Sequence, residues 1–311
     1  MTVETLAEVL AVDFNGSNVP FYNPDMRFER PADILRICYG LVVEFHGVHY
    51  VLHLTEEQRR QRLGTVKLAH FSVKEYFIKH ITNEQLSHSV IAQTCLAQLL
   101  YFDRPKILDW EQPHSLILNH INFLFPLTSY AALNWESHLH SSGAAAVQCP
   151  LLCQLQRQLF TSPTTLNHAF LSWLKIQNLI INVDYYDLRE KSNVLGRALR
   201  SFRPDRHFPL DASPLYYACF AGSVQAVQHL IKNNADIDRG GHQASTRPLL
   251  ISSEEGHLEI ARMMLDKGAN VDVVGGYYGK ALQAACMEGH LEPATLLRER
   301  GASDFELGVN E

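Results

Sequence analysis

Apolar residues recur with a fixed step in the last third of the chain. Three successive segments each place apolar residues at the spacing of a short helix, followed by a glycine turn and a second apolar helix. The segments begin at Ser213, Arg247 and Lys280. Their turn glycines, Gly222, Gly256 and Gly289, are 34 and then 33 residues apart. A step of this length predicts helix–turn–helix units that stack on one another to bury their apolar faces.

The three units resemble ankyrin repeats, in which two helices are followed by a hairpin-like finger. The first helices should bury Leu215, Leu249 and Leu282 on their inner faces. The second helices should end at a residue of left-handed backbone conformation, for which glycine and asparagine are best suited. These residues are Asn234, Gly268 and Gly301. One departure from the family is that its usual start, Thr-Pro-Leu-His, has lost the histidine in all three units.

The pattern in residues 64–77, GTVKLAHFSVKEYF, changes from alternation to helical spacing. Alternation over TVKLAHF predicts a half-buried strand. Ser72 and Glu75 have the spacing of a capping box, in which each side chain bonds the backbone N–H of the other residue. His70 and Ser72 also raise the alternative of a hydrolase site, but the flanking glycines of a nucleophile elbow are absent. We therefore predict that Ser72 and Glu75 are structural and begin a helix.

Segments on either side of this stretch carry a resemblance to a known family. Residues 2–12 have helical spacing, Pro31 is placed to begin a second helix, and LVVEF after Gly40 is strand-like. The stretches DILRICYGLV, LAHFSVKEYF, FLFPLTSYAALNWESHL and FLSWLKI resemble the region that follows the nucleotide-binding NACHT module in fungal NACHT–ankyrin proteins. These proteins are NLR-like signal-transducing ATPases. The resemblance implies a winged helix that ordinarily packs against the NACHT module, a helical connector and an ankyrin stack.

The NACHT module itself, which would bring ATPase chemistry, is not matched by this sequence. Its phosphate loop reads GxxxxGK followed by Ser or Thr. The nearest string, GGYYGKA at 275–281, has its glycines one residue too close and an alanine in place of the hydroxyl. We therefore assign this string to the finger between the second and third repeats. The chain is predicted to have no catalytic residues and no cofactor.

Composition and residue spacing argue against several other kinds of site. The net charge of −6 argues against a nucleic-acid partner. The six cysteines show no zinc pattern, and Cys149 and Cys153 are interpreted as thiols on one helix face. His138 and His140 are assigned to a helix end instead of to a metal site. The most apolar window, 116–133, is broken by polar residues and a proline, so we predict no membrane span. The expected location is the cytoplasm or the nucleus.

These inferences define a mostly α protein with four parts. The parts are a small α/β winged-helix domain at 1–85, an α-helical connector at 86–210 with a break near 141–150, a solenoid of three ankyrin repeats at 211–303, and a tail at 304–311. The predicted function is that of a non-enzymatic adaptor, which binds a protein partner through its repeats as the regulatory and sensor part of an NLR-like receptor would. The resemblance also implies an upstream NACHT module as a partner.

Ankyrin ligands usually contact the fingers and the exposed positions of the first helices. In this register, the helix positions are Tyr217, Phe220, Ile251, Glu254 and Met287, and the finger positions are Arg239, His242, Tyr277 and Tyr278. For Tyr217 and Phe220 the alternative is packing against the connector, because they belong to the first repeat. A winged-helix DNA-binding regulator is the alternative function, and it would need a basic face that residues 1–85 lack.

Overall fold

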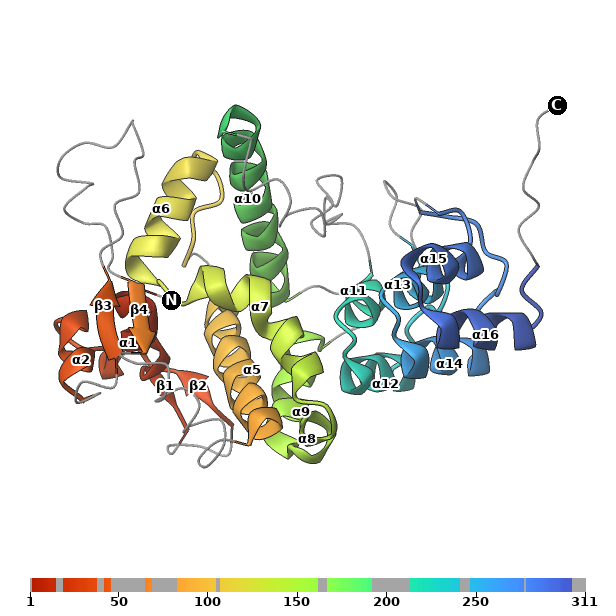
Figure 1. Ribbon diagram of the computed structural model, residues 1–311, viewed down its shortest axis with the longest axis horizontal. Helices are drawn as coiled ribbons and strands as arrows, with labels where there is room; N and C mark the ends of the chain where they lie inside the picture. The colour runs from red at the N-terminus through yellow and green to blue at the C-terminus, as the bar shows by residue number, and fades with distance from the viewer. Residues whose placement is uncertain are drawn as a thin grey trace. The chain divides into compact units, whose positions relative to one another are not determined.

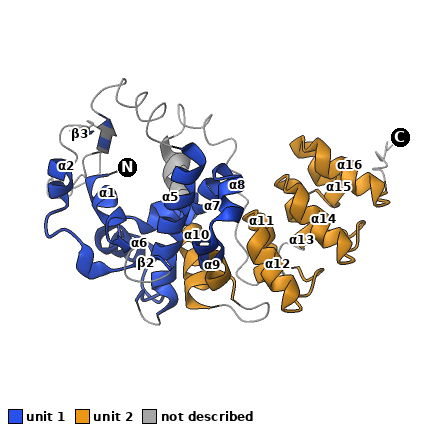
Figure 2. Ribbon diagram, turned by 90° about the horizontal axis from the view of Figure 1, so that it is seen from below, with its two compact units in different colours: residues 1–155, 179–184 blue, residues 156–178, 185–311 orange. Residues whose placement is uncertain are grey.

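The computed structural model describes most of the chain, and the described parts are mostly helical (Figure 1). The described residues are 2–14, 19–37, 42–45, 65–68, 83–104, 107–161, 167–191, 213–240, 247–276 and 278–303. The chain divides into two compact units, coloured separately in Figure 2. Unit 1 comprises residues 1–155 and 179–184, and unit 2 comprises residues 156–178 and 185–311. The division falls within helices α9 (Pro150–Leu159) and α10 (His168–Lys191).

Unit 1 begins with short helices and two small antiparallel sheets. Its elements up to residue 68 are α1 (Val3–Val9), β1 (Val12–Asp13), β2 (Phe21–Tyr22), the 3₁₀ turns η1 (Pro24–Met26) and η2 (Pro31–Asp33), α2 (Ile34–Ile37), β3 (Val42–Phe45) and β4 (Thr65–Leu68). Strand β1 pairs with β2, and β3 pairs with β4 in a register that places Val42 opposite Leu68. The predicted helical start at Pro31 is confirmed, and so are the predicted strands over the described parts of LVVEF and TVKLAHF.

A small apolar core joins these N-terminal elements. Val3, Ala7 and Ile34 are buried, and Val66 of β4 packs against them. The hydroxyl of Thr2 caps α1 by accepting the N–H of Thr5 at 3.1 Å. Ser72 and Glu75 lie outside the described residues, so the capping box stays a prediction.

Helices α5 and α7 form the main body of unit 1, where they lie side by side (Figure 1). The elements of this part are α5 (Glu84–Leu100), the 3₁₀ turn η4 (Tyr101–Asp103), α6 (His114–Leu124), α7 (Thr128–Ser141) and α8 (Ala144–Gln148). Leu96 and Trp135 are fully buried between them. The expected break near 141–150 is instead α8, because Ala145 and Ala146 are buried where α8 packs beside α5.

Unit 2 contains three helix pairs that follow one another with the predicted period. The pairs are α11 (Pro214–Phe220) with α12 (Val224–Lys232), α13 (Pro248–Glu254) with α14 (Leu258–Asp266), and α15 (Ala281–Glu288) with α16 (Leu291–Glu299). Leu215, Leu249 and Leu282 are buried, as predicted. Asn234 has a φ of 60°, and the glycines at the equivalent positions have φ of 88° and 87°. The predicted left-handed residues after the second helices are therefore confirmed.

Serine hydroxyls make local hydrogen bonds in the first helices of two repeats. In the first unit the hydroxyl of Ser213 accepts the N–H of Tyr216 and donates to the carbonyl of Arg239, both at 3.2 Å. In the second unit the hydroxyl of Ser253, in the last turn of α13, donates to the carbonyl of Leu249 at 2.8 Å. The bonds of Ser213 therefore cap α11 in a unit that lacks the family's usual histidine.

Part of the predicted connector packs on the first repeat inside unit 2. The rings of Phe170 and Trp173 in α10 contact the ring of Tyr217 edge to face, with centroids 5.5 Å and 6.0 Å apart. The hydroxyl of Ser223 donates to Oε1 of Gln156, in α9, at 2.6 Å. Residues 156–178 therefore fold with the ankyrin stack, and the connector predicted at 86–210 is divided between the two units.

Candidate partner-binding surface

The finger between the second and third repeats is a tight hairpin. Gly275 and Gly279 pair as an antiparallel bridge, and the Gly275 N–H donates to the Gly279 carbonyl at 2.7 Å. Gly279 has a φ of +81°, a conformation that a side chain would strain. Val274 enters this hairpin with 67% of its surface exposed. The string GGYYGKA at 275–281 is thus part of a finger, as predicted, and Val274, the residue before it, presents an apolar side chain to solvent.

A polar cluster holds the base of this finger. Asp272 Oδ1 accepts hydrogen bonds from the N–H and the hydroxyl of Ser303, at 3.0 Å and 2.7 Å, and pairs with Nζ of Lys280 at 3.3 Å. The hydrogen bonds from Ser303, more than the charge of Lys280, lower the pKa of the Asp272 carboxyl. The finger is therefore tied both to the start of α15 and to the residues after α16.

Tyr278 has a structural place in the same finger. It is 8% exposed and forms a buried cluster with Leu250 and Ala284. Its hydroxyl donates to the carboxylate of Glu288. The prediction that Tyr278 contacts a partner is therefore wrong, because the ring fills the space between the finger and the first helices. Tyr277 and His242 lie outside the described residues, and their assignments stay predictions.

The finger after the first repeat presents Arg239. The Asp238 N–H donates to Oδ1 of Asp236 at 3.1 Å, and the Arg239 N–H donates to the Asp236 carbonyl at 3.4 Å. The bond from Ser213 to the Arg239 carbonyl ties this turn to the start of α11. The side chain of Arg239 is exposed, so it is accessible to a partner as predicted.

The exposed stripe predicted along the first helices is largely absent from the described structure. Tyr217, Ile251 and Glu254 are 0%, 3% and 7% exposed. Tyr217 is covered by α10, and all seven residues of α13 are buried because α11 and α15 pack on its two sides. Phe220 is half-buried, and Met287 alone of the five helix positions is well exposed, at 69%. The packing alternative is thus correct for Tyr217.

Two accessible residues were missed from the sequence. Val274 directly precedes Gly275 and Gly276 in a finger, and an apolar residue at the start of a glycine turn is a signal that could have found it. Leu291 begins α16 and is 76% exposed, although its spacing is that of a core residue. The candidate partner-binding surface therefore consists of Arg239 and Val274 on the fingers, with Met287 and Leu291 at the end of the stack.

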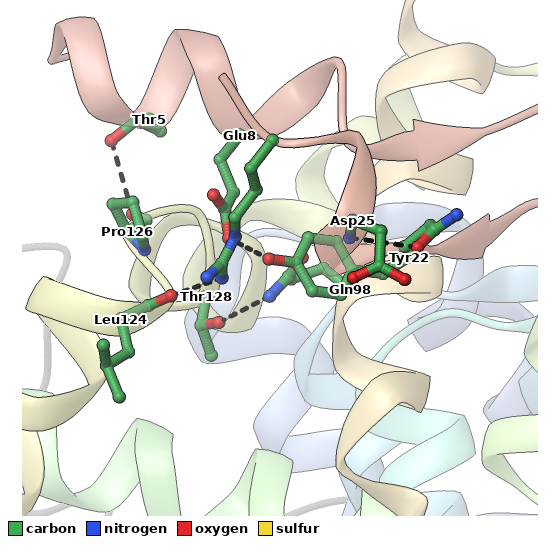
Figure 3. Close-up of polar contacts among 10 residues, drawn as sticks. Thr5, Glu8, Tyr22, Asp25, Gln98, Leu124, Pro126 and Thr128 are labelled. Carbon is green, nitrogen blue, oxygen red and sulfur yellow. Dashed lines mark hydrogen bonds and ion pairs between the residues drawn. The ribbon is translucent and has the colours of Figure 1, made fainter. Parts of the chain in front are cut away.

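A second polar cluster, in unit 1, joins the N-terminal elements to the bend between α6 and α7 (Figure 3). Glu8 is 4% exposed and pairs with the Arg27 guanidinium at 2.6 Å, and it also accepts the hydroxyl of Tyr22. Arg27 donates to the carbonyl of Leu124, and the hydroxyl of Thr5 donates to the carbonyl of Pro126 at 3.3 Å.

The groups of this cluster bind one another and so stabilise the fold of unit 1. Burial first, and then the Glu8 carboxylate, raise the pKa of the Tyr22 hydroxyl, so it stays a hydrogen-bond donor. The Arg27 guanidinium also lies 5.4 Å and 5.3 Å from the ring centroids of Tyr22 and Phe125. The Glu8 carboxylate, the Arg27 guanidinium and the rings of Tyr22 and Phe125 thus interact within one cluster. Because this cluster holds the bend between α6 and α7 against the N-terminal elements, we call it the clamp.

Histidine pairing in unit 1 joins α5 to α7. His138 places Nδ1 2.7 Å from Nδ1 of His88 and Nε2 2.6 Å from the hydroxyl of Tyr130. Burial, and then the neighbouring His88, lower the pKa of His138. Among the described residues no group of three potential ligands could hold a metal ion. His140 is exposed, and Cys149 precedes α9 instead of sharing a helix face with Cys153.

Unit 1 also contains a hollow along α6 and a bent, apolar pair of helices. A hollow of 550 Å³ lies along α6, lined by Ile107, Leu108, Asp109, Gln112, Leu116, Ile117, Asn119 and His120. Asp109 in its wall bonds the Glu111 N–H and the Gln112 side chain. No single described helix is long and apolar enough to cross a membrane, and only α6 and α7 taken together, bent by 79°, meet that test.

Comparison with known proteins identifies the repeats. Residues 197–274 and 215–307 match the family of ankyrin repeats, in three copies. Over 292 residues, or 87% of this chain, the sequence is 27% identical to the "Azaphilone pigments biosynthesis cluster protein L" of Monascus ruber, of which it covers 53%. Over 74 residues, or 24% of the chain, it is 35% identical to the human "Ankyrin repeat and SOCS box protein 18", of which it covers 16%.

These comparisons confirm the predicted ankyrin repeats and leave the N-terminal assignment as a prediction. The chain spans about half the length of the Monascus relative that it matches. Ankyrin repeats suggest protein–protein interaction, and the accessible finger residues of unit 2 are where such an interaction can be made.

Proposed function

We propose that this chain is a non-enzymatic interaction protein that binds a protein partner through the fingers of its ankyrin stack. The observation that carries the proposal is the second finger, where a bridged glycine hairpin presents Val274 with 67% of its surface exposed. An apolar side chain on a fixed, protruding turn loses little conformational entropy when it binds. It also gains from the removal of its surface from water.

The charge of the surface favours a neutral or basic partner segment. Acidic residues outnumber basic ones from residue 211 to the end of the chain. Around the first finger, Asp236 is exposed next to Arg239. A partner complementary to both fingers would place an apolar side chain on Val274. It would also place a basic group against Asp236 and an acidic group against Arg239.

The proposal extends to the role of the N-terminal part. Unit 1 would be the winged-helix and connector region of an NLR-like receptor, cytoplasmic or nuclear, acting with an upstream NACHT module. Support comes from the quoted stretches, from the short helices α1 and α2 beside the β3–β4 hairpin, and from similarity to a fungal protein over most of the chain. In this role the stack would sense a partner and unit 1 would relay its binding.

Capture of partners from an extract of the organism that carries the gene tests the proposal. We expect Val274→Asp to reduce recovery of the specific partner by about tenfold, as expected for the loss of one buried apolar anchor. Val147→Asp is the matched control, because Val147 is 58% exposed on α8 and does not belong to the ankyrin stack. Equal losses in both variants, or no loss in Val274→Asp, would reject the finger surface.

A further inference from the structure

The hydroxyl of Ser303 belongs to the polar cluster at the base of the second finger. Its Oγ donates to Oδ1 of Asp272 at 2.7 Å, and its N–H donates to the same atom at 3.0 Å. Nζ of Lys280 in turn donates to Oγ of Ser303. Ser303 is exposed to solvent. Its hydroxyl therefore holds the finger and is also accessible to an enzyme.

The sequence after Ser303 has the charge pattern of a kinase substrate. Asp304 is at the +1 position and Glu306 is at the +3 position. Of all the serines and threonines in the sequence, Ser303 alone has acidic residues at both positions. Protein kinases select substrates in part by charge pattern, and acidophilic serine kinases select carboxylates at these two positions. Ser253 is also followed by glutamates, but it is 0% exposed and so is not accessible to a kinase.

Transfer of a phosphoryl group to Ser303 would change the charge of the cluster. The terminal phosphoryl group of ATP forms a bond to Oγ while its bond to ADP breaks, and the hydroxyl proton passes to a carboxylate of the kinase. The product lacks the hydrogen that bonds Asp272, and its phosphate carries a charge of about −1.5 to −2 at neutral pH. Lys280, the cation that pairs with Asp272, can neutralise only part of the combined negative charge.

The bonds between Asp272 and Ser303 tie the second finger to the third repeat. Asp272 enters the finger, whereas Ser303 follows α16, 31 residues later. A phosphate placed beside a carboxylate disrupts local structure through like-charge repulsion. Lys280 would pair with the phosphate, because the phosphate carries the larger charge. Phosphorylation would thus break this tie and leave the Gly275–Gly279 bridge, which is internal to the finger, in place.

We propose that Ser303 is a phosphorylation site for an acidophilic serine kinase, and that its phosphorylation releases the second finger from the residues after α16. The consequence of this release rests on the proposed function, because the second finger carries Val274. A released finger must be ordered when it binds, and so it holds a partner more weakly than a fixed finger does. Phosphorylation of Ser303 therefore regulates partner binding by the fingers.

Incubation of the full chain with an acidophilic serine kinase and ATP tests the site, and mass spectrometry of its peptides locates the phosphate. We expect phosphate on Ser303 and none on the same peptide in Ser303→Ala. Transfer should be slower in the variant that combines Asp304→Asn with Glu306→Gln, because the acidic pattern is removed. An unmodified Ser303 would overturn the proposal. Transfer to this variant at an unchanged rate would also overturn it, since the pattern would then direct nothing.

Titration of the Asp272 carboxyl, followed by NMR, tests the release of the finger. In the unmodified chain the hydrogen bonds from Ser303 lower the pKa of Asp272. Phosphorylation should raise this pKa, because the bonds are lost and a negative charge is added. Asp109 in unit 1 is the matched control, since bonds from the Gln112 side chain and the Glu111 N–H lower the pKa of its carboxyl. A pKa of Asp272 that stays lowered after phosphorylation would show that the finger is not released.

Both of these tests are made without a partner, so their outcomes do not depend on the proposed function. In capture from the extract, the phosphorylated chain should recover about tenfold less partner than the unmodified chain, because the released finger must be ordered on binding. Equal recovery by these two chains, with a loss in Val274→Asp, would overturn the regulation and leave the proposed function standing. Equal recovery by all three would reject the finger surface and the regulation with it.

Discussion

Oε1 of Gln156 accepts a 2.6 Å hydrogen bond from the hydroxyl of Ser223, which lies 67 residues later in the chain. Both residues are buried, at 2% and 0% exposure. Leaving the buried Gln156 amide without this partner would lower the free energy of unfolding, so the bond fixes the end of α9 against the start of α12. The ankyrin stack is therefore completed by helices that come before its first repeat.

Tyr217→Ala should destabilise unit 2 strongly. The ring is fully buried and contacts Phe170 and Trp173, so its removal leaves a cavity that costs about 3–5 kcal/mol. Chemical denaturation followed by circular dichroism measures this loss. Phe123→Ala is the control, because that ring is 78% exposed. Similar midpoints for the two variants would show that Tyr217 does not join α10 to the stack.

Ile251→Ala should destabilise unit 2 more than Met287→Ala, because Ile251 is buried on its first helix and Met287 is exposed on its own. Ile251 is 3% exposed, so its truncation should cost about 2–4 kcal/mol. Met287 is 69% exposed, and its truncation should change the stability of unit 2 by less than about 0.5 kcal/mol. Thermal unfolding at low protein concentration makes the comparison. If Ile251→Ala lowered the free energy of unfolding no more than Met287→Ala does, Ile251 would be exposed, as the stripe predicted along the first helices requires.

Features set by local geometry within one repeat follow from the period of the sequence, whereas exposure that depends on neighbouring repeats does not. The period located Leu249 and the left-handed residue Asn234 correctly, because both are dictated by local geometry within one unit. It did not predict that Ile251 and Glu254 are buried, because their exposure depends on how closely the neighbouring helices approach. Val274 was missed for a similar reason, since a finger has no periodicity of its own. Recognition of repeats thus gave the fold of unit 2 and only part of its accessible surface.

Arg27→Met should loosen the clamp on the α6–α7 bend. It leaves the Glu8 carboxylate, 4% exposed, without its cation and should cost about 3 kcal/mol. Combining it with Glu8→Gln should recover part of that loss, because no buried charge then remains unpaired. A double-mutant cycle by urea denaturation measures the coupling. Additive effects of the two changes would mean that the ion pair contributes nothing to the clamp.

Acidification should destabilise the α5–α7 contact through His138. Burial and the neighbouring His88 lower the pKa of His138 below its ordinary value of 6.5. Below that value the unfolded chain binds a proton that the folded chain resists, so the free energy of unfolding falls as pH falls. The fall begins near the ordinary pKa and ends once pH has passed below the lowered one.

Urea denaturation at a series of pH values from neutral to mildly acidic checks this expectation. His138→Gln should flatten the dependence, whereas His120→Gln, at an exposed position on α6, should leave it unchanged. Cys95 and Tyr130 belong to the same surroundings, and burial raises the pKa of both, so neither titrates in this range. An unaltered pH dependence in His138→Gln would assign it to other groups.

The most direct test of the interaction function is photo-cross-linking in cells, with a photoreactive amino acid placed at residue 239, 274 or 147. Arg239 and Val274 are accessible on the fingers, and Val147 is accessible on α8. If the fingers hold the partner, positions 239 and 274 yield the same cross-linked protein and position 147 does not. Cross-links to that protein from position 147 alone, or cross-links from the fingers to nucleic acid instead of protein, would contradict the account.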